Sequence, residues 1–157
     1  MKKMIFMLSV ATTLCISTAF SAFASVNEET VNNKKVMETF QKEFTEAKNV
    51  EWFSDAKANS YTANFTIRES KVTAHFDNDG NLLNTSRYLT ESQLPLAVTN
   101  RLAKKYNGQH IENVVEYQAN GEFTYYVTVK STDNVFTIVK ATPEGWLSVY
   151  NKFKQAE

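Results

Sequence analysis

The chain has 157 residues, of which 43% are hydrophobic, and it carries 17 Lys and Arg against 17 Asp and Glu. This length is enough for one domain with its own hydrophobic core. The balanced charge argues against a general binding surface for nucleic acid or for anionic membranes.

Residues 1–24 are predicted to be a secretory signal peptide. Met1-Lys2-Lys3 is a cationic start, residues 4–20 are almost free of charge, and Ala22-Phe23-Ala24 is a small-x-small cleavage signal. The apolar run is short for a membrane span and no cationic stop follows it, so we expect no stable membrane anchor after cleavage. Leu14 precedes Cys15 and is not small, which argues against lipidation.

The exported chain is expected to contain no disulfide. Removing residues 1–24 from the 157 leaves 133 residues without cysteine, because Cys15 is the single cysteine. Stability must then come from packing. Loss of Lys2 and Lys3 leaves 15 cationic against 17 anionic residues, a net charge near −2. The expected location is the periplasm or the outside of the cell.

The first half of the exported chain predicts one helix and four strands. A polar, acidic and flexible leader at 25–33 precedes the spacing of an amphipathic helix that ends near Asn49. The apolar stripe of this helix consists of Val36, Met37, Phe40, Phe44 and Ala47. The predicted strands lie at 50–54, 60–68, 71–77 and 82–89, and Asp79-Gly80 predicts a turn between the last two.

The second half predicts the same elements again. Leu94-Pro95 opens a helix whose stripe contains Leu94, Val98, Leu102 and Tyr106, and Gly108 can cap its end. Strands are expected at 111–118, 122–130, 135–142 and 146–153. We expect a single domain over 34–157, made of two repeats at 34–89 and 90–157.

Matching residues support this internal repeat. Val50-Glu51-Trp52 returns as Val115-Glu116-Tyr117, and Gly80 returns as Gly145, both 65 positions later. Tyr61, Ala63 and Phe65 return as Tyr125, Val127 and Val129 after 64 positions. A slip of one residue exchanges the faces of a strand, so either a bulge or a turn of different length separates the copies.

The predicted fold class is α+β, with both helices packed on one face of an antiparallel sheet and the other face open to solvent. The alternation places polar and aromatic side chains on this open face. Those expected to bind a partner are Asn64, Arg68, His75, Tyr126, Lys130, Trp146 and Tyr150. The same residue types are also good strand formers, which is the competing interpretation.

No pattern of catalytic, cofactor or metal-binding residues is present. The two histidines, His75 and His110, lie in different halves, and the exported chain has no cysteine. Asp77-Asn78-Asp79-Gly80 matches part of a calcium loop, but His75 falls at the first position, which needs an oxygen ligand, and Ser86 at the twelfth, which needs Glu, so a turn is expected. Glu51 and Glu116 lie between apolar residues and are expected on the wet side or at a sheet edge, where they are solvated or form salt bridges.

Several segments stand together in an order typical of one known family. They are Phe44, Ala47-Lys48-Asn49-Val50-Glu51-Trp52, Tyr61-Thr62-Ala63-Asn64-Phe65, Val72-Thr73-Ala74-His75-Phe76-Asp77, Asp79-Gly80 and Leu94-Pro95. On these residues the chain resembles the PepSY-like, beta-lactamase-inhibitor-like family of exported bacterial proteins. The resemblance implies two tandem units outside the cytoplasm and offers no catalytic motif. A shared shape does not imply lactamase inhibition.

The sequence thus favours an exported, non-enzymatic binding module without cofactors that modulates or inhibits an envelope protein, or holds a cell-surface ligand, through the open face. The alternative is a small-ligand carrier or an enzyme with a cleft between the two repeats, in which His75, Glu51 and Arg68 are the polar candidates. The resemblance adds a third hypothesis, modulation of an envelope protease.

Overall fold

The computed structural model describes residues 32–154. The predicted signal peptide and residues 25–31 of the predicted leader lie outside this range. Within it, no helix is both long and apolar enough to cross a membrane.

The chain forms two helices and eight strands that follow one another in simple order. Helix α1 (Lys34–Glu43) precedes β1 (Lys48–Asp55), β2 (Ser60–Ile67), β3 (Ser70–Asp77) and β4 (Leu82–Leu89). A short helix η1 (Glu91–Gln93) and α2 (Leu96–Lys105) precede β5 (His110–Ala119), β6 (Glu122–Lys130), β7 (Val135–Ala141) and β8 (Leu147–Lys154). Each strand pairs antiparallel with the next, which gives one open sheet in chain order.

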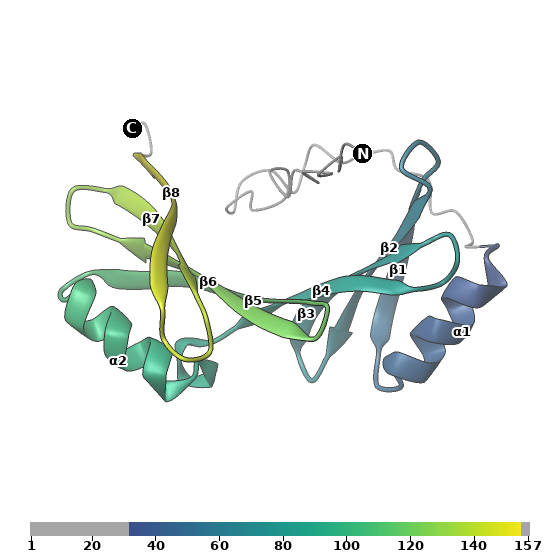
Figure 1. Cartoon of the computed structure of the whole chain (residues 1–157), viewed down its shortest axis with the longest axis horizontal. Coiled ribbons are helices and arrows are strands. Elements are labelled where there is room, and N and C mark those ends of the chain that lie inside the picture. Colours follow the sequence, from purple (N-terminus) through teal and green to yellow (C-terminus); the bar gives the residue numbers. More distant parts are fainter. Residues whose placement is uncertain (1–31, 155–157) are drawn as a thin grey trace, which may run out of the picture.

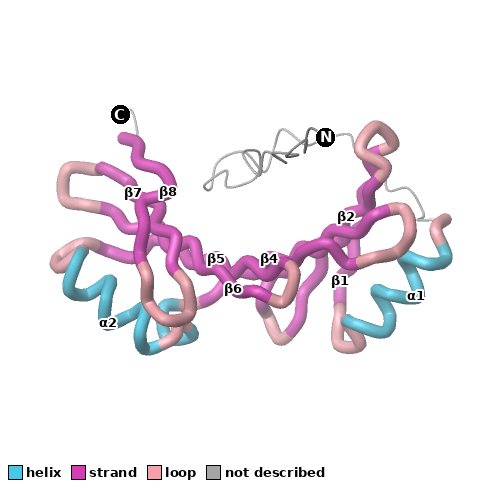
Figure 2. The backbone as a smooth tube through the Cα atoms, in the orientation of Figure 1, coloured by secondary structure: helices cyan, strands magenta, loops and turns pink. Residues whose placement is uncertain are grey.

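The sheet is curved, and both helices lie on its outer, convex side, one under each half (Figure 1). The tube view shows the strands running without interruption from one half to the other through β4 and β5 (Figure 2). The predicted antiparallel sheet with helices on one side is therefore confirmed. The opposite, concave side carries no described helix.

The first half packs α1 onto β1–β4 through a cluster of aromatic side chains. The Asn33 side chain accepts hydrogen bonds from the backbone N–H groups of Lys35 and Val36, which starts the helix at the expected point. Phe40 then lies 5.0 Å from Trp52 and 5.1 Å from Phe65 between ring centroids. Edge-to-face contacts of this kind stabilise a core beyond the area that they bury.

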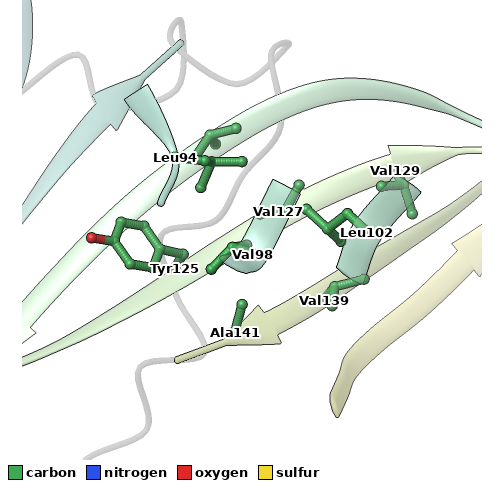
Figure 3. Close-up of a cluster of buried hydrophobic side chains, with 9 residues drawn as sticks. Leu94, Val98, Leu102, Tyr125, Val127, Val129, Val139 and Ala141 are labelled. Atoms are coloured by element: carbon green, nitrogen blue, oxygen red, sulfur yellow. The ribbon is translucent and has the colours of Figure 1, made fainter. Parts of the chain in front are cut away.

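The second half has its own cluster, formed by aliphatic side chains (Figure 3). Val98 and Leu102 of α2 point onto β6 and β7, where Val127 and Val139 lie. Phe40, Phe65, Phe76, Leu94, Val98 and Leu102 are buried in the two clusters, whereas Phe44 is half-buried. The two clusters share no residue, so each helix stabilises its own half.

The register explains the change of spacing between the halves. Tyr125, Val127 and Val129 face the helix, as Tyr61, Ala63 and Phe65 do. The β1–β2 turn consists of residues 56–59, whereas the β5–β6 turn consists of residues 120–121. The β2–β3 turn consists of residues 68–69, whereas the β6–β7 turn consists of residues 131–134. These differences in turn length account for the change between the 65-residue and 64-residue spacings of matching residues.

One consequence corrects the expected position of Glu116. Trp52 packs in the first core, but Tyr117 contacts Tyr126 on the open face, so the two residues do not occupy equivalent positions. Glu116 accordingly faces the helix side, is 8% exposed and accepts a 2.6 Å hydrogen bond from Nε of Arg87. Glu51 is exposed, as expected.

Two glycines bring the strand ends against the helices. Gly80 lies between β3 and β4 with φ of 86°, and a Cβ on it would lie 2.8 Å from the backbone carbon of Lys35. Gly145 lies between β7 and β8 with φ of 88°, and its Cβ would lie 2.8 Å from the carbonyl oxygen of Ala97. Only glycine accepts both this backbone conformation and this close approach.

Candidate functional site: the open face of the sheet

The concave side of the sheet, hereafter the open face, collects four tyrosines on β4, β5, β6 and β8. Tyr88 of β4 pairs in register with Val115, and Val115 pairs with Tyr126 of β6. Tyr117 of β5 and Tyr150 of β8 contact Tyr126 from either side, at 6.5 and 5.1 Å between ring centroids. We call Tyr88, Tyr117, Tyr126 and Tyr150 the tyrosine patch.

The tyrosine patch offers both apolar surface and hydrogen-bond donors. Tyr88 and Tyr150 are each 46% exposed. Burial raises the pKa of Tyr117 and Tyr126, so their hydroxyl groups remain protonated at neutral pH. Lys140 of β7, which is exposed, pairs in register with Tyr126 and adds one cation to the patch. Aromatic rings with polar tips are frequent at the centres of protein interfaces.

Beyond the patch, the open face of the second half is filled by its own side chains. Phe136 and Phe153 stack with ring centroids 5.4 Å apart, and Phe136 is buried. Nζ of Lys130 lies 5.2 Å from the centroid of Phe136 and 3.8 Å from the Glu112 carboxylate. Neighbouring side chains thus contact one another across this part of the face.

The open face of the first half is polar and internally hydrogen-bonded. Thr62 Oγ1 and His75 Nδ1 are 2.9 Å apart, and the Thr73 hydroxyl donates to the side-chain oxygen of Asn64 at 2.8 Å. Burial lowers the pKa of His75, so its ring is neutral at pH 7. These residues satisfy one another and offer few free groups to a partner.

Five of the seven candidate binding residues lie on the open face: Asn64, His75, Tyr126, Lys130 and Tyr150. Arg68 does not, because it lies in the turn after β2 with φ of 47° and pairs with Glu46 at 2.9 Å. Trp146 lies in the turn before β8, next to Gly145 and the start of α2. Arg68 was assigned to the face by extending the alternating pattern of β2 beyond the end of that strand.

Sequence reasoning missed Tyr88, Tyr117 and Lys140. Their signal was available in the alternation of each strand. Leu89, Val114 and Val139 face the helix side, so residues an odd number of positions away in the same strand face the other way. These include Tyr88, Tyr117 and Lys140. The repeat comparison concealed Tyr117, because it matched this residue to the buried position of Trp52.

The polar groups suggested for a ligand carrier or an enzyme do not converge. His75 is hydrogen-bonded to Thr62, Arg68 to Glu46, and Glu51 lies on the edge strand opposite Asn64. A hollow at the β1–β2 turn is lined by Phe53, Ser54, Asp55, Ala56, Lys57 and Thr62, and so contains none of the three.

Residues 77–81 form the expected turn. The Asp77 carboxylate accepts hydrogen bonds from the backbone of Asp79 and Asn81 and from the Asn81 side chain. In the described part of the chain, no group of three metal-ligating side chains comes together.

The fold is shared with solved bacterial structures. A BLIP-like protein from Bacteroides fragilis is 20% identical with a TM-score of 0.66, and 78% of this chain aligns with 87% of that one. A DUF2874 family protein from Bacteroides uniformis is 22% identical, with 76% and 87% of the chains covered and a TM-score of 0.64. A protein from Bacteroides eggerthii, described as a candidate periplasmic protein, is 21% identical, with 76% and 86% covered and a TM-score of 0.64.

No protein-family model matches the sequence, and no curated protein matches it either. At these identities the likeness shows a common fold and nothing about a common ligand. The BLIP-like architecture inferred from the resemblance is therefore supported, whereas the PepSY-like name remains a prediction.

Proposed function

We propose that this chain is an exported, non-enzymatic binding module that holds an envelope protein on the tyrosine patch of its open face. The observation that carries the proposal is the gathering of four tyrosines, from β4, β5, β6 and β8, on the side of the sheet that the helices leave uncovered. A soluble fold does not need large aromatic side chains on a solvent-exposed sheet face.

The shape and charge of the face favour a particular kind of partner. Its concave curvature suits a convex protein surface better than a flat one (Figure 1). The phenol hydroxyls and Lys140 supply hydrogen bonds and one positive charge, so the partner should present carbonyl or carboxylate oxygens around an apolar centre. Modulation or inhibition of the partner would follow if this contact covers the partner's active site or its own binding surface.

We also infer that the two halves are copies of one ancestral unit. The same order of elements, and the matching contacts of Gly80 with α1 and of Gly145 with α2, support this inference. Three of the four tyrosines of the patch, Tyr117, Tyr126 and Tyr150, belong to the second copy, whereas the first copy contributes Tyr88 alone. Specialisation of one copy for binding accounts for this difference.

Site-specific photocrosslinking in the producing bacterium tests the proposal. A photoreactive phenylalanine analogue at position 88 or 150 should capture one envelope protein, because both side chains point from the open face to solvent. Phe123 provides a matched control, since it is 40% exposed but neighbours Gln118 on the helix side.

The expected result is a crosslink from positions 88 and 150 that position 123 does not give. Tyr126→Ala should abolish it while the unfolding transition is retained, since Tyr126 contacts both Tyr117 and Tyr150. Equal capture from all three positions, or none from 88 and 150, would exclude the tyrosine patch as the binding site.

A further inference from the structure

Trp146 extends the aromatic surface of the open face toward the β7–β8 turn. Ala141 and Leu147 pair with each other and face the helix side. The next residues of this hairpin are Thr142 and Trp146, and the Thr142 N–H donates a 3.1 Å hydrogen bond to the Trp146 carbonyl oxygen. Because side chains alternate along each arm of the hairpin, Trp146 leaves it on the open-face side, where it is 76% exposed.

The register arranges most of the tyrosine patch in a row that crosses the strands. Tyr88 pairs with Val115, and Val115 pairs with Tyr126. Tyr126 in turn pairs with Lys140, which is exposed. This first row therefore presents two phenol rings and one ammonium group, and Tyr150 contacts it from β8.

A second row lies beside the first. Tyr117, two residues after Val115 in β5, pairs with Thr124 of β6. Since the neighbouring pair is Tyr125 with Ala141, the row continues through Thr142 and ends at Trp146. Small threonine side chains thus separate the aromatic rings at the two ends of this row.

The two rows offer hydrogen-bond donors and no carboxylate. The tyrosine hydroxyls, the Lys140 ammonium and the Trp146 indole N–H all donate. Glu122 at the start of β6 and Glu144 in the β7–β8 turn lie outside the rows. Strands β4–β7 each have a paired neighbour on both sides, so their backbone groups are engaged and only side chains can hold a ligand there. A matching ligand therefore presents hydrogen-bond acceptors and flat apolar groups.

We propose that the tyrosine patch and Trp146 bind an extended, proline-rich segment of the partner protein. Proline in the polyproline II conformation has free carbonyl oxygens, no backbone N–H and a flat apolar ring, so it matches a surface of aromatic rings and donors. An added β-strand would need free backbone groups, which the middle of the sheet lacks. A glycan presents many hydroxyl hydrogens, for which these rows hold no carboxylate or amide acceptor.

The width of the surface suits a short segment. In the sheet order, β4 and β8 are four strands apart, about 19 Å at the usual strand spacing. About six residues of polyproline II span this distance, at about 3.1 Å per residue. The inference rests on the proposed function, because it names the part of the envelope partner that the open face holds.

Isothermal titration calorimetry of residues 25–157, which contain both hydrophobic clusters, tests the inference. The probe is a synthetic peptide of about eight prolines, which is longer than the span of the patch. A glycine–serine peptide of the same length is its control, because it offers the same carbonyl oxygens without proline rings or a preset conformation. We expect the proline peptide to bind at least about tenfold more tightly.

Substitutions on the two sides of the sheet locate the binding site. Tyr126→Ala and Trp146→Ala should each weaken binding at least about tenfold, because each removes an aromatic ring. Tyr88→Phe with Tyr150→Phe keeps the rings, removes two hydroxyl donors and should weaken binding about three- to tenfold. The control Phe123→Ala removes a ring that is 40% exposed beside Gln118 on the helix side, and should bind as the unchanged chain does. Urea unfolding verifies that each variant is folded.

Three results would overturn the proposal: no binding of the proline peptide, equal affinity for the glycine–serine peptide, or full affinity in both Y126A and Y88F/Y150F. Binding of chitotetraose in place of the proline peptide would assign the surface to a glycan and overturn it too. A dimer in light scattering that Y126A converts to a monomer, without peptide binding, would assign the surface to a second copy of the chain.

Photocrosslinking separates this inference from the function on which it rests. Capture of an envelope protein from positions 88 and 150 without peptide binding overturns this inference alone. Peptide binding without capture supports the recognition of proline and counts against an envelope protein as the partner. Where both occur, excess proline peptide should suppress the crosslink, and a crosslink that it leaves unchanged overturns the inference.

Discussion

Phe65 and Thr66 are neighbours in β2 and lie on opposite faces of the sheet. Phe65 is buried against Phe40 and Phe44, whereas the Thr66 hydroxyl donates to the carbonyl oxygen of Lys48 at the open surface. The free energy of the fold should therefore depend strongly on one residue and weakly on the next. Period-two alternation along the strand is the cause.

Chemical denaturation of four variants measures this contrast. Phe65→Ala should lower the free energy of unfolding by about 3–5 kcal/mol, because it opens a cavity among aromatic rings. Phe44→Ala should cost somewhat less, since Phe44 is half-buried. Thr62→Ala and Thr66→Ala should each cost about 1 kcal/mol, the value of a hydrogen bond near the surface. Comparable losses in both pairs would show that the faces are assigned wrongly.

His75 gives the fold a dependence on pH between neutrality and weak acid. Burial lowers its pKa in the folded state, so the unfolded chain binds a proton at a higher pH than the folded chain does. Stability is therefore complete above the unfolded pKa of about 6.5 and declines as the pH falls below it. His75→Gln should flatten this decline in urea titrations at about pH 7.5 and pH 5.5. An unchanged slope in that variant would assign the dependence to another group.

At the scale of elements, the glycines after β3 and β7 determine how closely each hairpin approaches its helix. Gly80→Ala and Gly145→Ala combine a positive φ, which costs about 1–2 kcal/mol, with a backbone clash that adds about 1–3 kcal/mol. Gly121→Ala is the control, because its φ of 79° is similar but no atom lies within 4 Å. Melting curves should place both variants well below G121A, and equal losses would mean that the helices yield easily.

The elements were predictable because their signals are local. The strand at 122–130 has the predicted bounds, since its alternation is bounded by Gly121 and by a polar turn. Which face of a strand is buried was less predictable, because a difference in turn length changes the face without changing the alternation. Glu116 and Tyr117 were misplaced for this reason, and Arg68 because it lies in a turn. The tyrosine patch needed strand pairing across four strands, which no local pattern contains.

At the scale of the whole molecule, two separate cores are joined by the pairing of β4 with β5. Each half alone is small for an independent domain without disulfides, so the shared sheet must hold the halves together. The pairing runs from Asn84 with Ala119 to Leu89 with Val114. Near its middle, Arg87 and Glu116 form an ion pair on the helix side.

Removing one partner of this pair should weaken the junction between the halves. Arg87→Met leaves the Glu116 carboxylate, whose side chain is 11% exposed, without its cation. The expected loss is about 1–3 kcal/mol, less than for a fully buried pair because the Arg87 side chain is 49% exposed and partly screened by water. Arg87→Met with Glu116→Met should recover much of the loss, since the double variant buries no uncompensated charge. A double-mutant cycle in urea measures the coupling, and additive losses would mean that backbone pairing alone joins the two halves.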